Sequence, residues 1–228
     1  MTAAPVRKRG RPPAAETVET RERIIEAAVD LFAEKGFHGT GVAEIGDRAQ
    51  VQRGALYYHI RSKEELLFEI LRSYTDLVDA DARVIVEGAG DPVDKLRELI
   101  RSHVRLITAH RREVTIHMRD VSALTGDRAL DLQRLGADIR QRWQDVIDAG
   151  YAAGALRTAD RVIGNSILSM LNSVIFWYHE DGEHGPDAIA DLIATAVLDG
   201  LIQSPASVAI SESTTMKVEE YSHDRHHR

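Results

Sequence analysis

A series of amphipathic helical segments near the N-terminus is the feature that most constrains this chain. Residues 20–36 read TRERIIEAAVDLFAEKG, and apolar side chains recur there at positions i, i+3, i+4 and i+7. These positions are Ile25, Ala28, Val29 and Phe32. We expect Thr20 to cap the start of this helix, and Gly36 to end it, because glycine readily adopts the left-handed conformation. The pattern predicts a helix over residues 20–36 with one buried face.

Three more helical segments follow at short intervals. We predict a second helix over residues 40–49, capped by Thr40, and a brief third helix within QVQRGALYYHI, residues 50–60. The expected inward positions of the third helix are Val51, Ala55 and Leu56. A longer fourth helix follows, and Ser62 and Glu65 at its start have the spacing of a capping box. The short step between the second and third helices is the one that a helix-turn-helix requires.

The rest of the chain also has helical periodicity, so the predicted fold class is all-α. Apolar positions repeat with the helical period over residues 92–111, 113–124, 127–154 and 186–202. Residues 160–178 are apolar nearly throughout, and we therefore expect this segment to be buried on several sides.

The composition argues against several classes of protein. The chain has no cysteine, which excludes a disulfide framework, a thiolate nucleophile and a cysteine-ligated zinc ion. A metal hydrolase is a rival, since there are ten histidines, but no zinc-protease, calcium-loop or nucleophile-elbow motif occurs. We predict no catalytic residues, no metal site and no cofactor. No apolar run approaches the roughly 20 residues of a membrane span, so we expect a cytoplasmic protein.

Charge is distributed unevenly along the chain, whose net charge is −7. Residues 1–65 hold 11 basic and 10 acidic side chains, whereas residues 66–228 hold 18 and 26. Nucleic-acid binding depends on local patches, and an acidic chain is therefore compatible with it.

Four motifs in the first third of the chain occur in a fixed order. They are A-x-x-L-F-x-E-x-G at residues 28–36, Thr40, L-Y-Y-H at residues 56–59 and S-K-E-E-L at residues 62–66. Together they resemble the TetR family of bacterial transcriptional repressors, over residues 24–71. Three positions depart from the family pattern: Gln50 replaces a glycine at the bend, Gly41 replaces a hydroxyl residue, and Ile60 replaces a phenylalanine. A positive φ is wanted at the bend, which glutamine adopts only at a cost.

The resemblance implies a helix-turn-helix head, joined by a long helix to a C-terminal helical ligand-binding and dimerisation domain. The expected boundaries are a disordered basic arm (1–19), the DNA-binding domain (20–65), the second domain (66–203) and a disordered tail (204–228). The implied partners are a double-stranded palindromic operator, a small hydrophobic or amphipathic effector and a second copy of the chain. The best candidates for the dimer contact are residues 160–178 and 186–202, and the alternative is that these two segments only complete the core of the monomer. Residues 176–201 also resemble the members that sense acyl-CoA thioesters.

The predicted DNA contacts come from the third helix and its neighbours. Arg53 suits guanine and Gln52 suits adenine in the major groove, while tyrosine hydroxyls and histidine nitrogens suit phosphates. The expected DNA-binding residues are Thr40, Gln52, Arg53, Gly54, Tyr57, Tyr58, His59 and Lys63. Alternatively, Tyr58 simply covers the base of the fourth helix.

The N-terminal arm carries the sequence RKRGRPP. Its basic residues Arg7, Lys8, Arg9 and Arg11 suit a narrow A·T minor groove. The alternative is a solvated tail without DNA contacts.

The effector site is expected among the helices of the second domain. The candidate lining residues are His103, Ile107, Met118, Trp143, Asn172, Phe176 and Trp177. Asn172 is the most informative of these, since a buried amide needs a partner, whereas an aromatic residue at helical spacing is more often plain core. The candidate residues for binding an anionic head group, such as a CoA phosphate, are Arg101, Arg105, Arg111, Arg112 and Arg119.

The alternative to the whole assignment is an acidic helical adaptor that binds protein only.

Overall fold

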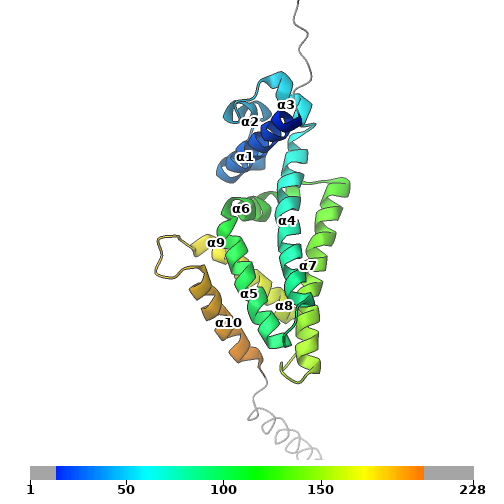
Figure 1. Ribbon diagram of the computed structural model, residues 1–228, viewed down its shortest axis with the longest axis vertical. Helices are drawn as coiled ribbons and strands as arrows, with labels where there is room; N and C mark the ends of the chain where they lie inside the picture. The colour runs from blue at the N-terminus through cyan, green and yellow to red at the C-terminus, as the bar shows by residue number, and fades with distance from the viewer. Residues whose placement is uncertain (1–13, 203–228) are drawn as a thin grey trace, which may run out of the picture. The chain divides into compact units, whose positions relative to one another are not determined.

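A computed structural model describes the backbone of residues 14–202 and the side chains of residues 17–202 (Figure 1). Within this range no strand forms, and Leu156 and Ile202 make an isolated antiparallel β-bridge. The predicted all-α fold is confirmed. The helices are α1 (Ala14–Gly39), α2 (Val42–Arg48), α3 (Arg53–His59), α4 (Lys63–Glu87), α5 (Pro92–Ala109), α6 (Arg111–Asp120), the 3-10 helix η1 (Val121–Ala123), α7 (Gly126–Ala152), α8 (Arg161–Asn172), α9 (Val174–Trp177) and α10 (Pro186–Leu201).

The chain divides into two compact units. The first unit contains the described residues up to Leu77 together with His110–Gly136, and the second contains Val78–Ala109 and the residues from Ala137 onward. Helices α4 and α7 each contribute residues to both units. The first unit therefore includes α6 and η1 in addition to the head expected at residues 20–65.

Helix α1 supplies much of the core of the first unit. Ala28 and Phe32 are fully buried, as the apolar periodicity predicts, but Ile24 and not Ile25 is the fully buried residue of the preceding turn. The helix begins at Ala14, so Thr20 lies inside it and does not cap it. The predicted cap was wrong because regular helix extends N-terminal to the first apolar position of the stripe.

Gly36 breaks α1, and α6 bonds to the backbone groups at the break. With φ 81° and ψ 163°, Gly36 is non-helical, so nearby carbonyl and amide groups need other partners. The Arg119 guanidinium donates to the carbonyl oxygen of Phe32 and to that of Ala33, at 3.3 Å for the latter. The buried carboxylate of Asp120 accepts the Phe37 amide hydrogen, with an N···O distance of 3.1 Å. Helix α6 is thereby bonded directly to the end of α1.

The turn between α2 and α3 brings the two helices into close contact. Gln50 has φ 56°, which confirms the positive φ expected at the bend despite the missing glycine. The Val51 amide donates to the Gly46 carbonyl at 2.9 Å and closes the turn. A Cβ on Gly46 would lie 2.9 Å from Cδ2 of the buried Leu56, so only glycine fits there without a shift. Ala55, expected to point inward, is exposed, and Leu56 makes the main contact.

The predicted start of α4 is confirmed. The Ser62 hydroxyl oxygen accepts the Glu65 amide hydrogen at 3.1 Å, as a capping box requires. The Glu65 carboxylate returns to the Arg61 amide at 2.8 Å. The helix then buries Leu66, Leu67, Ile70 and Leu71 in the first unit.

In the second unit α10 packs along α5 (Figure 1). The predicted inward face of α5 is confirmed, since its apolar positions and His103 are buried. The prediction that residues 160–178 are buried on several sides was wrong. The segment breaks at Ser173 into α8 and α9, and its exposed large apolar side chains are Val162, Met170, Phe176 and Trp177.

We predict that Gln50→Gly stabilises the protein, because glycine adopts a left-handed backbone without the cost that glutamine incurs. The expected gain in the free energy of unfolding is about 0.5–1 kcal/mol, measured by urea denaturation. The matched control is Gln133→Gly in the interior of α7, which should lower the same quantity by about 0.5–1 kcal/mol. Equal losses in both variants would contradict the account of the turn.

Candidate DNA-binding surface and effector region

The exposed face of α3 carries large aromatic and basic side chains. Tyr57 is 55% exposed and Tyr58 66% exposed, although both belong to a helix whose Leu56 is buried. The Arg53 guanidinium lies over the Tyr57 ring, 5.8 Å from its centroid. Tyr58 therefore does not simply cover the base of α4. The face presents hydroxyl donors, aromatic rings and a cation to its surroundings.

Three other predicted contacts lie around this face. Gln52, at the N-cap of α3, and Gly54 are exposed, and a Cβ on Gly54 would meet nothing within 4 Å. No packing constraint from the described residues therefore requires glycine at this position. His59 is half-buried, with its ring edge-on to Tyr58 and the two ring centroids 5.2 Å apart. The structure thus brings Gln52, Arg53 and the tyrosines onto one short element.

Thr40 and Lys63 have structural partners. Thr40 is buried, and its hydroxyl donates toward the carbonyls of Gly36 (2.8 Å) and Leu31 (3.1 Å). The N-cap of α2 is Gly41, so the prediction of Thr40 as the cap was wrong. The Lys63 ammonium donates to the carbonyls of Phe37 (2.7 Å) and Thr40 (2.8 Å). The predicted phosphate contacts of Thr40 and Lys63 stay predictions.

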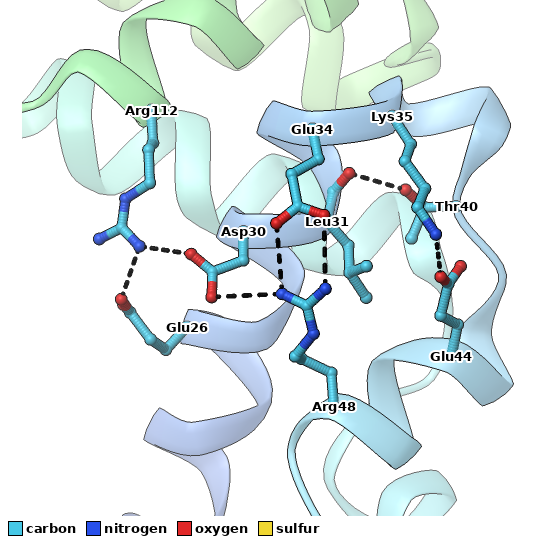
Figure 2. Close-up of polar contacts among 9 residues, drawn as sticks. All are labelled: Glu26, Asp30, Leu31, Glu34, Lys35, Thr40, Glu44, Arg48 and Arg112. Carbon is cyan, nitrogen blue, oxygen red and sulfur yellow. Dashed lines mark hydrogen bonds and ion pairs between the residues drawn. The ribbon is translucent and has the colours of Figure 1, made fainter.

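Ion pairs connect α1 with both α2 and α6, as Figure 2 shows. Arg112 of α6 contacts Glu26 at 2.8 Å and Asp30 at 2.5 Å. Arg48 of α2 contacts Glu34 at 3.3 Å and the same Asp30 at 3.7 Å. All of these side chains are substantially exposed, so each pair contributes little stability by itself and is weakened by salt. Asp30 of α1 is thus a shared partner of Arg48 and Arg112.

The predicted minor-groove arm, with Arg7, Lys8, Arg9 and Arg11, lies outside the described residues. Its role in DNA binding stays a prediction.

A short exposed helix, placed by a tight turn on a preceding helix, defines a helix-turn-helix DNA-binding protein. The comparisons identify the family. Residues 24–70 match the model of bacterial regulatory proteins of the tetR family, and residues 89–201 match the tetracyclin repressor-like C-terminal domain. The chain is 32% identical over 184 residues to the HTH-type transcriptional repressor KstR2 of Rhodococcus jostii, covering 79% of this chain and 90% of that protein. It belongs to the TetR family of bacterial transcriptional regulators.

Solved structures have the same fold. The ketosteroid transcriptional regulator KstR2 of Mycobacterium tuberculosis superposes with a TM-score of 0.75 at 27% identity, covering 81% of this chain and 95% of that one. AibR, solved in complex with isovaleryl coenzyme A and operator DNA, superposes with a TM-score of 0.72 at 27% identity, covering 78% and 97%. These relatives are regulators, which argues against the protein-only adaptor.

No helix within residues 14–202 is long and apolar enough to cross a membrane. In the same described part of the chain, no group of three or more His, Asp or Glu side chains is arranged to hold a metal ion.

In the second unit the buried His103 pairs with the half-buried Asn172. His103 is 8% exposed, and its Nε2 lies 3.0 Å from Oδ1 of Asn172. The indole of the fully buried Trp143 meets the His103 ring edge-on, with ring centroids 5.9 Å apart. Burial lowers the pKa of His103, an effect that the Asn172 hydrogen bond opposes. Asn172 thus has a hydrogen-bond partner in His103.

The other predicted effector residues are more widely distributed. Ile107 is fully buried on α5, the helix that carries His103. Phe176 is 73% exposed and Trp177 49% exposed on α9. Met118 is 44% exposed and belongs to the first unit. The structure therefore brings together His103, Trp143 and Asn172, and their role in effector binding stays a prediction.

Sequence reasoning missed the residues that position the DNA-binding face. Gly46 shows no periodic signal, and its role depends on its distance from Leu56 across the turn. Asp120 and Arg119 act on α1 from a distant part of the chain, which a single sequence does not reveal. The signal that the sequence offers for this contact is the adjacent pair Arg119 and Asp120, with which α6 ends.

We predict that Lys63→Met destabilises the first unit, because two carbonyl oxygens lose a charged donor. The expected loss in the free energy of unfolding is about 1–3 kcal/mol, measured by urea denaturation. Lys35→Met is the matched control, since the partner of Lys35 among residues 17–202 is Glu44, in an exposed ion pair, and it should cost less than about 1 kcal/mol. Similar losses in the two variants would show that the Lys63 hydrogen bonds contribute no special stability.

We predict that His103→Gln reduces the pH dependence of stability. Because burial lowers the folded-state pKa of His103, the unfolded chain binds more protons below the ordinary pKa of 6.5, and the free energy of unfolding falls as pH falls. The variant should flatten this slope by up to roughly 1.4 kcal/mol per pH unit between pH 6.5 and the lowered pKa. The exposed His179→Gln is the control, and an unchanged slope in His103→Gln would contradict the buried neutral imidazole.

Proposed function

We propose that this protein is a cytoplasmic repressor that binds a palindromic operator as a homodimer and leaves it when a small effector binds. The exposed face of α3 is the observation that carries the proposal. Arg53 and Gln52 occupy the N-terminal part of the helix, the end from which recognition helices reach base edges. Tyr57 and Tyr58 supply phosphate donors and apolar ring faces.

The second unit supports dimerisation through an exposed apolar surface. Val162 and Met170 of α8, Phe176 and Trp177 of α9 and Leu192 of α10 are all at least 40% exposed. Where such side chains form a contiguous exposed patch, the patch marks a protein interface or another binding site. A second copy of the chain is the occupant that a two-fold operator requires.

The effector is proposed to be an amphipathic molecule, with an acyl-CoA thioester as the leading candidate. AibR, with the same fold, was solved with isovaleryl coenzyme A, which supports this class. The apolar surroundings of the pair formed by His103 and Asn172 suit an apolar ligand that carries a hydrogen-bonding group. We propose that the effector changes the arrangement of α4, the helix whose residues belong to both units.

DNA upstream of the gene provides the test. The wild-type protein should protect two half-sites about one helical turn apart, with an affinity that falls steeply as salt rises. Arg53→Ala should cost about 1–3 kcal/mol of binding free energy and relax the choice of base at one position in each half-site.

Arg83→Ala is the control, because Arg83 is exposed on the part of α4 that belongs to the second unit. It should leave base selection unchanged. Absence of salt-dependent protection in the wild type, or equal selectivity in Arg53→Ala and the wild type, would contradict the proposal.

A further inference from the structure

Most of the arginines expected to meet an anionic head group are paired with carboxylates. Arg101 contacts Asp191 and Arg105 contacts Asp187, each at 2.6 Å. In the first unit, Arg112 is bound by Glu26 and Asp30, and Arg119 by Asp120. A guanidinium already neutralised by a carboxylate is a poor anion receptor, so a site for an anion has to use other arginines.

Two arginines without a carboxylate within ion-pair distance, among the described residues, line one cavity in the second unit. The cavity lies between α7 and α8 and has a volume of about 270 Å³. Arg140 lines it from α7 and Arg161 from α8, and both side chains are exposed. The lining groups carry two positive charges and no negative charge.

Neutral polar side chains of the cavity hold its geometry. The Arg161 guanidinium donates to Oε1 of Gln141 at 3.2 Å. The buried Gln144 is fixed by its amide nitrogen, which donates to the carboxylate of Asp148 at 2.7 Å and to the carbonyl oxygen of Ala159 at 2.8 Å. The carboxylate of Asp145 binds the amide nitrogen of Gln141 at 2.8 Å. The carboxylates of Asp145 and Asp148 are therefore bonded to amides and form no ion pair with Arg140 or Arg161.

We propose that this cavity binds the phosphate group of a small ligand, with Arg140 and Arg161 as its charged donors. A guanidinium presents parallel N–H groups that match phosphate oxygens, and two of them neutralise a dianion. The volume admits a phosphate-sized group and is too small for a whole acyl-CoA. The phosphate belongs either to a coenzyme A thioester or to a smaller phosphorylated molecule, and only the first source rests on the proposed effector class.

Titration calorimetry of the full chain with free coenzyme A and, separately, with inorganic pyrophosphate tests the site. At low salt, Arg140→Gln and Arg161→Gln should each weaken binding by about tenfold or more, as expected for the loss of a charge-assisted hydrogen bond. The control is Arg134→Gln, which makes the same charge change at an exposed position of α7 that does not line the cavity. It should bind as the wild type does.

The outcomes separate the two sources from each other and from general charge attraction. Binding of coenzyme A alone, with the arginine dependence, supports the thioester source, whereas binding of pyrophosphate with the same dependence supports a smaller phosphorylated ligand. Absence of binding by both probes overturns the site, and so does equal weakening in Arg134→Gln. Operator binding by the same variants is measured in parallel, so a failure of the proposed repressor function is seen independently of the phosphate site.

Discussion

The contact between Gly46 and Leu56 is the constraint on which the proposed DNA-binding face depends. Leu56 anchors α3 from its buried side, and a Cβ at position 46 would push it away. The left-handed backbone of Gln50 allows the chain to turn sharply enough for this contact. Because neighbouring residues of a helix lie about 100° apart, fixing Leu56 inward leaves Tyr57 and Tyr58 outward. Packing at one apolar residue thus decides which side chains the helix presents.

Hydrogen bonds to backbone groups near the end of α1 connect α6 and α4 to the head of the first unit. The break at Gly36 leaves polar backbone groups that water does not reach easily, and Arg119, Asp120 and Lys63 bond to them. These side chains come from α6 and α4, helices with no part in base recognition as we propose it. The end of α1 is therefore sensitive to the positions of both helices. This provides a physical route by which a change in α4 alters the head.

The fold was largely predictable because its signals are local. Apolar periodicity located the helices, and the Ser62–Glu65 spacing located the start of α4. The errors have a common cause in contacts that a single sequence does not display. Thr40 reads as a cap but bonds to the carbonyl oxygens of Leu31 and Gly36, and the hydrogen bonds of Lys63 to the end of α1 have no signal in the sequence. The exposed apolar side chains of α8 and α9 read as core, because periodicity does not distinguish a buried face from one that awaits a partner.

The central claim is that the outward face of α3 binds DNA, and ring-selective NMR of the tyrosines tests it most directly. Tyr57 and Tyr151 are similarly exposed, at 55% and 53%, and Tyr151 lies in the second unit. On addition of a duplex that the protein protects, the ring signals of Tyr57 and Tyr58 should shift while those of Tyr151 stay in place. A duplex that binds without moving the Tyr57 and Tyr58 signals would contradict the account.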